Sequence, residues 1–343
     1  MAAFSFDQAR CWFLRSGIQE PGGGIARYYR SDIQRSAPVS TEITGYGVST
    51  LAFTGEIDAA LRAARYLAHS AWDPGSHTFP FEPGSKLAYF FDIGIIARGL
   101  LAAWRATGET EFLDRARDAT LSLAFDFLGD GMFHPVIALP EKDPLPHEPR
   151  WSRSPGCYQL KSALAWREVG DEQAAKLWEI ALQNALAAHE SFLDRESDRE
   201  RLMDRLHAYC YFLEATLFEA DRAEVRGALA YGIERAASLL REIAPQFERS
   251  DVCAQLLRIR LIAHHLNAVE LDAEAAWEEA GRAAGYQSDS GDPRLRGGFW
   301  FGRRGGEFLP YMNPVSTAFC LQALQLWRDH RDGAWSFDLH QLI

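Results

Sequence analysis

The stretch LAYFFDIGIIARGLLAAWRATGETEFLDRARDATLSLAFDFL, residues 87–128, decides the fold class. Its first half, Leu87–Ala106, has helical spacing and carries small and apolar residues on every side, which is typical of a buried helix. Its second half, Glu109–Leu128, is amphipathic and charged, as expected of a helix with one face in solvent. The short turn Thr107-Gly108 separates the two halves. The stretch therefore predicts a hairpin of one buried and one half-exposed helix.

The same alternation recurs along the whole chain, and strand-like alternation is scarce. The other predicted pairs are Glu42–Ala52 with Ile57–Ala71, Cys157–Glu168 with Asp171–Phe192, Leu206–Glu219 with Arg222–Ile243, Asp251–Leu266 with Asp272–Ala284, and Pro314–Arg328 with Phe6–Arg15. Six such hairpins predict an all-α protein, a single (α/α)6 toroid domain over residues 1–343 with inner and outer helix rings. An open solenoid of helix pairs is the alternative. The N-terminal helix 6–15, which completes the sixth pair beside helix 314–328, favours the closed ring.

Composition excludes several classes of function. The 343 residues carry a net charge of −11, which argues against a nucleic-acid partner because phosphate binding needs clustered Lys and Arg. No run of 18 apolar residues occurs, so no membrane span is expected. The five cysteines have no paired spacing, which favours reduced thiols and a cytoplasmic location. The sequence leaves the oligomeric state open.

Loop lengths indicate which face of the ring carries the site. Connections within a pair are short, whereas connections from one pair to the next are long, at Trp72–Lys86, Gly129–Gly156, Leu193–Arg205 and Gly285–Asn313. Long loops without structure of their own are usually functional. In a toroid they gather on one face with the N-termini of the inner helices, whose dipoles favour anionic groups. An acidic protein can therefore still hold an anionic ligand at this face.

Polar side chains at the starts of the inner helices are the candidate site residues. The predicted catalytic residues are Asp92, Asp251, Glu42 and His207. The predicted substrate-binding residues are Tyr46, Gln159, Lys161, Tyr209, Gln255, Arg258, Trp300, Tyr311 and Asn313. Singly, several of these have a plain structural interpretation, as helix caps or buried partners of other charges. Their convergence on one end of the ring favours function, because burying so many polar groups is costly.

The sequence predicts no cofactor and no metal ligand set. Cys157, His207, Cys210 and Cys253 all lie near inner-helix starts, which leaves a zinc site open. Only His207 and Cys210 have a short ligand spacing, so we interpret the cysteines first as core residues.

Three segments carry a resemblance to a known superfamily: STEITGYGVSTL (40–51), FDIGIIARGLLAAW (91–104) and PYMNPVSTAFCLQAL (310–324). With the hairpin array, they resemble the six-hairpin glycosidase-like proteins, which include unsaturated glucuronyl hydrolases and N-acylglucosamine 2-epimerases. The resemblance implies an (α/α)6 toroid of bacterial polysaccharide metabolism that handles sugars with polar inner-helix residues. Of the paired aspartates of the glucuronyl hydrolases, only Asp92 has a plausible place here, and the catalytic histidines of the 2-epimerases have no clear counterpart.

The leading hypothesis is glycoside hydrolysis of a saccharide or glycan, possibly anionic, by two carboxylates, Asp92 and Asp251, with Glu42 as the substitute for either. His207 and Tyr209 would orient the substrate or move a proton, Arg258 and Lys161 would hold a carboxylate, and Trp300 would stack on a sugar ring. A uronate epimerase or lyase is the second hypothesis. A non-catalytic glycan-binding or scaffold protein of polysaccharide biosynthesis is the third. Fold by itself does not choose among them.

Overall fold

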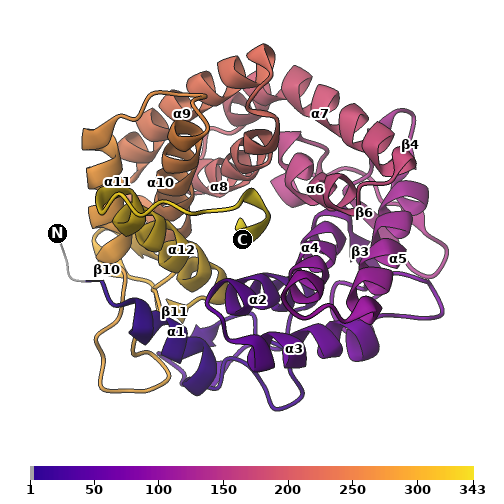
Figure 1. Ribbon diagram of the computed structural model, residues 1–343, viewed down its shortest axis with the longest axis horizontal. Coiled ribbons are helices and arrows are strands. Elements are labelled where there is room, and N and C mark those ends of the chain that lie inside the picture. The colour runs from indigo at the N-terminus through magenta and orange to yellow at the C-terminus, as the bar shows by residue number, and fades with distance from the viewer. Residues whose placement is uncertain (1–3) are drawn as a thin grey trace.

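The computed structural model describes residues 4–343 and builds two concentric rings of helices, seen end-on in Figure 1. The inner ring consists of α2 (Thr41–Phe53), α4 (Phe90–Thr107), α6 (Leu160–Val169), α8 (Arg199–Thr216), α10 (Ser250–His265) and α12 (Pro314–Arg331). The outer ring consists of α1 (Phe6–Arg15), α3 (Ile57–Arg65), α5 (Thr110–Asp126), α7 (Glu172–Phe192), α9 (Ala223–Ile243) and α11 (Ala273–Ala284). Short helical turns extend or connect several of these helices: η1 (Tyr66–Ala71), η2 (Trp151–Arg153), η3 (Cys157–Gln159), η4 (Leu193–Arg195), η5 (Leu217–Glu219) and η6 (Leu339–Gln341).

Contacts between neighbours close the ring. Each inner helix contacts the next one along the chain, and α12 returns to contact α2. The N-terminal helix α1 packs against α12, at the place expected of the sixth outer helix (Figure 1). The prediction of an all-α toroid of six hairpins is confirmed, and the open solenoid is excluded.

Residue size explains why the inner helices pack so closely. In α4 every residue from Phe90 to Leu101 is buried, whereas α5 buries one face only. A Cβ atom on Gly99 would lie 2.5 Å from the backbone oxygen of Gly45 in α2. On the other side of α4, a Cβ atom on Gly94 would lie 2.3 Å from the Cβ atom of Ser162 in α6. Glycine at these positions lets the backbones of α2, α4 and α6 touch.

Two predicted helix starts are wrong: Leu87–Tyr89, predicted as helix, forms a strand before α4, and the larger error is at α8. Helix α8 begins at Arg199 and not at Leu206, and the side chain of Asp198 caps it by accepting a hydrogen bond from the Arg201 amide. The run RERLMDR (199–205) is mostly charged, so the sequence analysis did not predict a helix there, although the side chains of Leu202 and Met203 are buried. The connection that was expected to be a long loop over 193–205 is therefore mostly helical. His207 consequently lies in the third turn of its helix and not at its start.

The remaining long connections form small antiparallel sheets beside the starts of the inner helices. Their strand orders are β11-β1-β2, β3-β6-β7 and β10-β9-β8, with a separate β4-β5 hairpin. The strands are β1 (Tyr29–Arg30), β2 (Arg35–Ser36), β3 (Leu87–Tyr89), β4 (Leu128–Gly129), β5 (Met132–Phe133), β6 (Val136–Ala138), β7 (Asp143–Pro144), β8 (Phe247–Arg249), β9 (Gly302–Arg304), β10 (Glu307–Phe308) and β11 (Tyr311–Met312). In the register, Tyr29 pairs with Met312 and Ala88 pairs with Ile137.

After α12 the chain turns inward. Residues 332–343, here called the tail segment, run from the outside of the ring to its centre (Figure 1). Leu342 and Ile343 are each only 1% exposed. Within residues 4–343, no helix has the length and apolarity needed to cross a membrane.

Candidate functional site

Polar side chains inside the ring form two layers at different depths. The first, here called the mouth layer, lies toward the starts of the inner helices and consists of Glu42, Asp92, His207, Asp251 and Gln255. The second, here called the floor layer, consists of Arg98, Lys161, Glu214, Arg258 and Gln322. His207 and Glu214 on α8 are two helical turns apart, as are Asp251 and Arg258 on α10, which corresponds to about 10 Å along the helix axis. Gln255, which contacts His207, lies between these levels on α10.

Two carboxyl groups of the mouth layer interact strongly. Burial raises the pKa of Glu42, on α2, to about 7, and the guanidinium of Arg27 opposes this rise. Burial also raises the pKa of Asp92, on α4, well above its usual value, and the negative charge of Glu42 raises it further. Asp92 Oδ2 is buried without a hydrogen-bond partner. The pair is therefore suited to hold a proton near neutral pH, as carboxyl groups used in acid–base catalysis do.

His207 is held neutral on the neighbouring side of the layer. Its Nδ1 lies 2.7 Å from Gln255 Oε1 on α10 and 3.9 Å from Asp251 Oδ2. Because an amide oxygen only accepts hydrogen bonds, this contact places the hydrogen on Nδ1 and leaves Nε2 as an acceptor. Burial and the positive charge of Arg249 lower the pKa of His207 to about 4, although Asp251 opposes them. His207 is thus an uncharged base at neutral pH.

Asp251 differs from the other two acids because it is ion-paired. Arg249, at the end of β8, donates to its Oδ1 at 3.0 Å and to its Oδ2 at 2.7 Å. The same guanidinium donates to Asp204 Oδ1 at 2.7 Å. Burial, the largest single effect, would raise the pKa of Asp251, but the charge and hydrogen bonds of Arg249, with smaller effects of His207 and the Val252 amide, together lower the pKa below its usual value. Asp251 therefore remains a carboxylate and is poorly suited to donate a proton.

Aromatic side chains contact His207 and one another at the level of the mouth layer. The ring of Tyr211 lies 4.5 Å from that of His207, 4.7 Å from that of Phe91 and 6.5 Å from that of Tyr46, centroid to centroid. Tyr46 also contacts Phe319 on α12, with centroids 5.4 Å apart. Tyr211 was missed by the sequence analysis, although its i, i+4 spacing from His207 places both on one face of α8.

The floor layer is a buried network of ion pairs and hydrogen bonds. Glu214 on α8 accepts from Lys161 Nζ at 2.9 Å and from Arg258 Nε at 2.8 Å. Arg258 also donates to Gln322 Oε1 at 3.0 Å. The side chains of Lys161, Glu214 and Arg258 have no exposed surface. The structure thus places Lys161 and Arg258, both predicted as substrate-binding residues, beneath the mouth layer with a shared partner.

The other predicted binding residues are spread around the ring. Gln159 donates to the Phe133 carbonyl at 2.9 Å, close to the strands that flank α4. Tyr209 does not join His207: its hydroxyl lies 3.1 Å from His189 Nδ1 on the outer helix α7, because residues two apart face different sides of a helix. Asn313 caps α12 by accepting from the amides of Val315 and Ser316. Tyr311, on β11, and Trp300, which forms an isolated bridge with Met312, are partly buried in the long connections.

Unpaired polar atoms converge on the mouth layer. Besides Asp92 Oδ2, the buried atoms without a hydrogen-bond partner include Gln255 Nε2 and Ser316 Oγ, on α10 and α12. Buried polar groups are normally paired in proteins, by protein atoms, water or a ligand. Three such atoms on three inner helices indicate that this end of the ring is built to be filled by a polar ligand.

The cysteines show no metal-site geometry. Among residues 4–343, no group of three His, Cys, Asp or Glu side chains is arranged to hold a metal ion. Cys210 and Cys253 are fully buried, and burial raises the pKa of both thiols well above the usual value. A thiol that resists ionisation is a poor zinc ligand.

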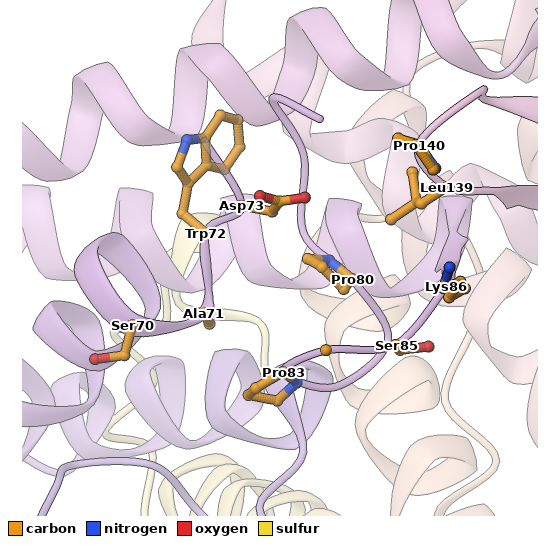
Figure 2. A pocket seen from close by; sticks show the side chains of 11 residues that line it. Ser70, Ala71, Trp72, Asp73, Pro80, Pro83, Ser85, Lys86, Leu139 and Pro140 are labelled. Atoms are coloured by element: carbon orange, nitrogen blue, oxygen red, sulfur yellow. The ribbon is translucent and has the colours of Figure 1, made fainter. Parts of the chain in front are cut away.

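A separate pocket of about 390 Å³ lies among the loops outside the inner ring (Figure 2). Trp72, Asp73, Pro80, Lys86 and Pro140 are among its lining residues, and none of the mouth layer reaches it. The ring of Trp72 contacts Phe79, with centroids 5.0 Å apart, and Arg115, 4.4 Å away. These contacts show that Trp72 packs the loop, and the pocket lacks a convergent set of catalytic groups.

No protein-family model matches the sequence, and no curated protein matches it either. Solved structures match over nearly the whole chain. Cellobiose 2-epimerase from Spirochaeta thermophila is 14% identical, with a TM-score of 0.72 and coverage of 95% of each chain. A sugar epimerase from a ruminal bacterium is 11% identical, with a TM-score of 0.68 and coverage of 93% of this chain and 96% of the other. A D-mannose isomerase is 9% identical, with a TM-score of 0.68 and coverage of 95% and 96%.

The fold is an (α/α)6 toroid of six helical hairpins, as the resemblance predicted, and the solved structure of cellobiose 2-epimerase shares it. A further match is a family 76 glycoside hydrolase, an α-mannanase from Bacteroides thetaiotaomicron, at 11% identity and a TM-score of 0.61. It covers 96% of this chain and 98% of its own. At these identities the likeness establishes the fold, and the chemistry has to be argued from the site.

Proposed function

We propose that this protein is a carbohydrate-active enzyme that hydrolyses a glycosidic bond in the mouth layer, with Asp92 as general acid and Glu42 as its partner carboxylate. The observation that carries the proposal is the raised pKa of both groups, on adjacent helices, in a layer with unpaired polar atoms. The fold supports a sugar substrate, since the similar structures named above act on sugars by their titles.

In the proposed reaction, Asp92 and Glu42 have different protonation states and therefore different roles. Asp92 has the more strongly raised pKa, so it holds the proton and donates it to the leaving glycosidic oxygen. Glu42, whose pKa is about 7, acts as the carboxylate that activates water or attacks the anomeric carbon. Arg27 stabilises the charged form of Glu42 and offers a positive charge to an anionic sugar. Asp251, which Arg249 holds ionised, orients His207 instead of donating a proton.

Turnover assays on a panel of neutral and uronate-containing oligosaccharides test this assignment. We expect Asp92→Asn and Glu42→Gln each to lower kcat by a factor of about 100 or more, because each removes a proton donor or a charged partner. Asp118→Asn is the matched control, since Asp118 is half exposed and lies on the outer helix α5, away from the mouth layer. Full activity of both acid variants on a confirmed substrate would disprove the assignment.

A second candidate function rests on His207. A neutral histidine with a free Nε2 suits abstraction of a proton beside a carbonyl, as in sugar epimerisation or isomerisation. Two of the similar structures are epimerases and one is an isomerase by title. Incubation in deuterated water separates the candidates: epimerisation would introduce deuterium on a sugar carbon without bond cleavage, whereas hydrolysis would release a new reducing end. Saccharide binding without either outcome would favour a binding protein.

A further inference from the structure

We propose that the substrate is the end of a glycan chain and not an internal stretch of a polymer, because the tail segment closes the ring from its far side. This inference rests on the proposed function and adds to it the form of the substrate. A polymer bound through its middle must pass through an open tunnel or lie along an open groove. The structure argues against both routes.

Hydrogen bonds to the floor layer hold the tail segment in the ring. Arg98 on α4 donates to the Leu342 carbonyl at 2.8 Å, and Lys161 on α6 donates to the Ile343 oxygen at 3.0 Å. Gln322 on α12 donates to the Gln341 carbonyl at 2.7 Å and accepts from the Ile343 amide at 3.2 Å. Through Glu214 and Arg258 the same network reaches α8 and α10.

The burial of the floor layer shows that this level of the ring is filled. Lys161, Glu214 and Arg258 have no exposed side-chain surface, so neither solvent nor an internal cavity touches them. A pocket of about 350 Å³ remains on the far face, between the tail residues 338–341 and the ends of α2 and α4, and no floor or mouth residue lines it. In contrast, Glu42 in the mouth layer is partly exposed. Access to the two acids is therefore from the mouth side only.

The mouth side is walled by the loop strands. Strand β11 pairs with β1, β6 pairs with β3, and β9 pairs with β8, so that each of three sectors of the rim carries a sheet. Arg304 on β9 also pairs with Glu200 at the start of α8, at 2.8 Å. Trp151 packs edge-on against Phe91, next to Asp92, with centroids 6.1 Å apart. A chain that enters between these walls reaches the acids by its end and stops at the floor.

The experiment compares linear and cyclic forms of one substrate. Wild-type protein is first given tetra- to hexasaccharides labelled at the reducing end, both neutral and uronate-containing, and the products are followed by mass. The linear oligosaccharide that is turned over is then compared with its cyclic form, which has the same glycosidic bonds and no end. We expect stepwise loss of terminal units from the linear form, and at least a 100-fold lower rate on the cyclic form.

Each outcome decides one point. Early products from internal bonds, or equal rates on cyclic and linear forms, would overturn the chain-end inference and leave the proposed hydrolysis standing. Failure to turn over any member of the panel would overturn the proposed hydrolysis, and the inference with it. A variant that lacks residues 339–343 supplies a second test if it folds with native circular dichroism: a linear chain could then pass through the opened floor, so early products from internal bonds of the linear form should appear.

Discussion

Arg249 binds both carboxylate oxygens of Asp251, at 3.0 and 2.7 Å, from a strand that ends immediately before the helix on which Asp251 lies. Both side chains are almost completely buried. This pairing explains why Asp251, a plausible catalytic acid by its position in the sequence, is held as a carboxylate while Asp92 and Glu42 are not. Catalytic roles among buried acids follow their charge partners more than their place along a helix.

Breaking this pair should weaken the fold. Arg249→Gln leaves the Asp251 carboxylate buried without its counter-charge, and we expect a loss of about 3–5 kcal/mol in the free energy of unfolding. Urea denaturation measures the loss. Arg304→Gln is the control: its pair with Glu200 is about half exposed, and the expected change is below about 1 kcal/mol. Equal losses in the two variants would contradict the buried pairing.

Activity should rise as pH rises through about 7 and fall again only at higher pH. Glu42 has to lose its proton, which it does above a pKa of about 7, whereas Asp92, whose pKa is raised well above its usual value, has to keep its proton. Arg27→Met removes the positive charge that lowers both pKa values, so the alkaline limb of the profile of kcat/KM against pH should move to higher pH. Arg30→Met, at an exposed pair with Asp32, should leave the limb unmoved. An unmoved limb in Arg27→Met would sink the proposed coupling.

The stability of the protein should depend on the charge of Glu214 in the floor layer. Replacement by Gln leaves Lys161 and Arg258 buried without a negative partner, so we expect a loss of stability of about 3–5 kcal/mol. Thermal unfolding followed by circular dichroism measures it. Glu172→Gln, which breaks an exposed pair with Lys176, is the matched control and should change little. A stable Glu214→Gln protein would show that the tail segment does not rely on this network.

A histidine cluster anchors the tail segment to the ends of two inner helices. His265 Nε2 lies 3.0 Å from His330 Nδ1, the ring of His264 adjoins both, and Trp335 stacks on His265 at 3.7 Å between centroids. Trp327 also faces His330. Burial lowers the pKa of His265 and of His330, and charges on neighbouring histidines lower them further.

Stability should therefore decrease as pH falls below about 6.5, the ordinary pKa of an unfolded histidine. A depressed folded pKa means that the unfolded chain binds the protons first, so the folded state loses its advantage in acid and keeps it above that pH. Melting temperatures between pH 5 and pH 8 test this for the wild type and for His330→Asn, whose slope should be smaller. Identical slopes of melting temperature against pH in the two proteins would rule out the histidine cluster as the source of the pH dependence.

Much of the fold follows from residue character along the chain. Stretches that are apolar on all sides, such as Phe90–Leu101, can only be buried, and amphipathic partners such as Glu172–Phe192 must cover them. The start of α8 was not predicted because its first two turns are mostly charged, and Leu202 and Met203 are the only apolar side chains there that reach the core. Helix propensity and hydrophobic periodicity predict the start of a helix poorly where the helix begins in solvent and ends in the core.

The candidate site, like the fold, was predicted only in part from the sequence. The sequence by itself determined that acids, a histidine and aromatic residues stand on the inner helices, because those positions lie in segments that must face the ring's interior. Only the tertiary structure decided which of them meet: Glu42 with Asp92, Asp251 with Arg249, and Lys161 with Arg258 around Glu214. It also placed the tail segment in the ring. Such pairings depend on which helices become neighbours and at what depth, and the local periodicity of one helix carries no information about its partner.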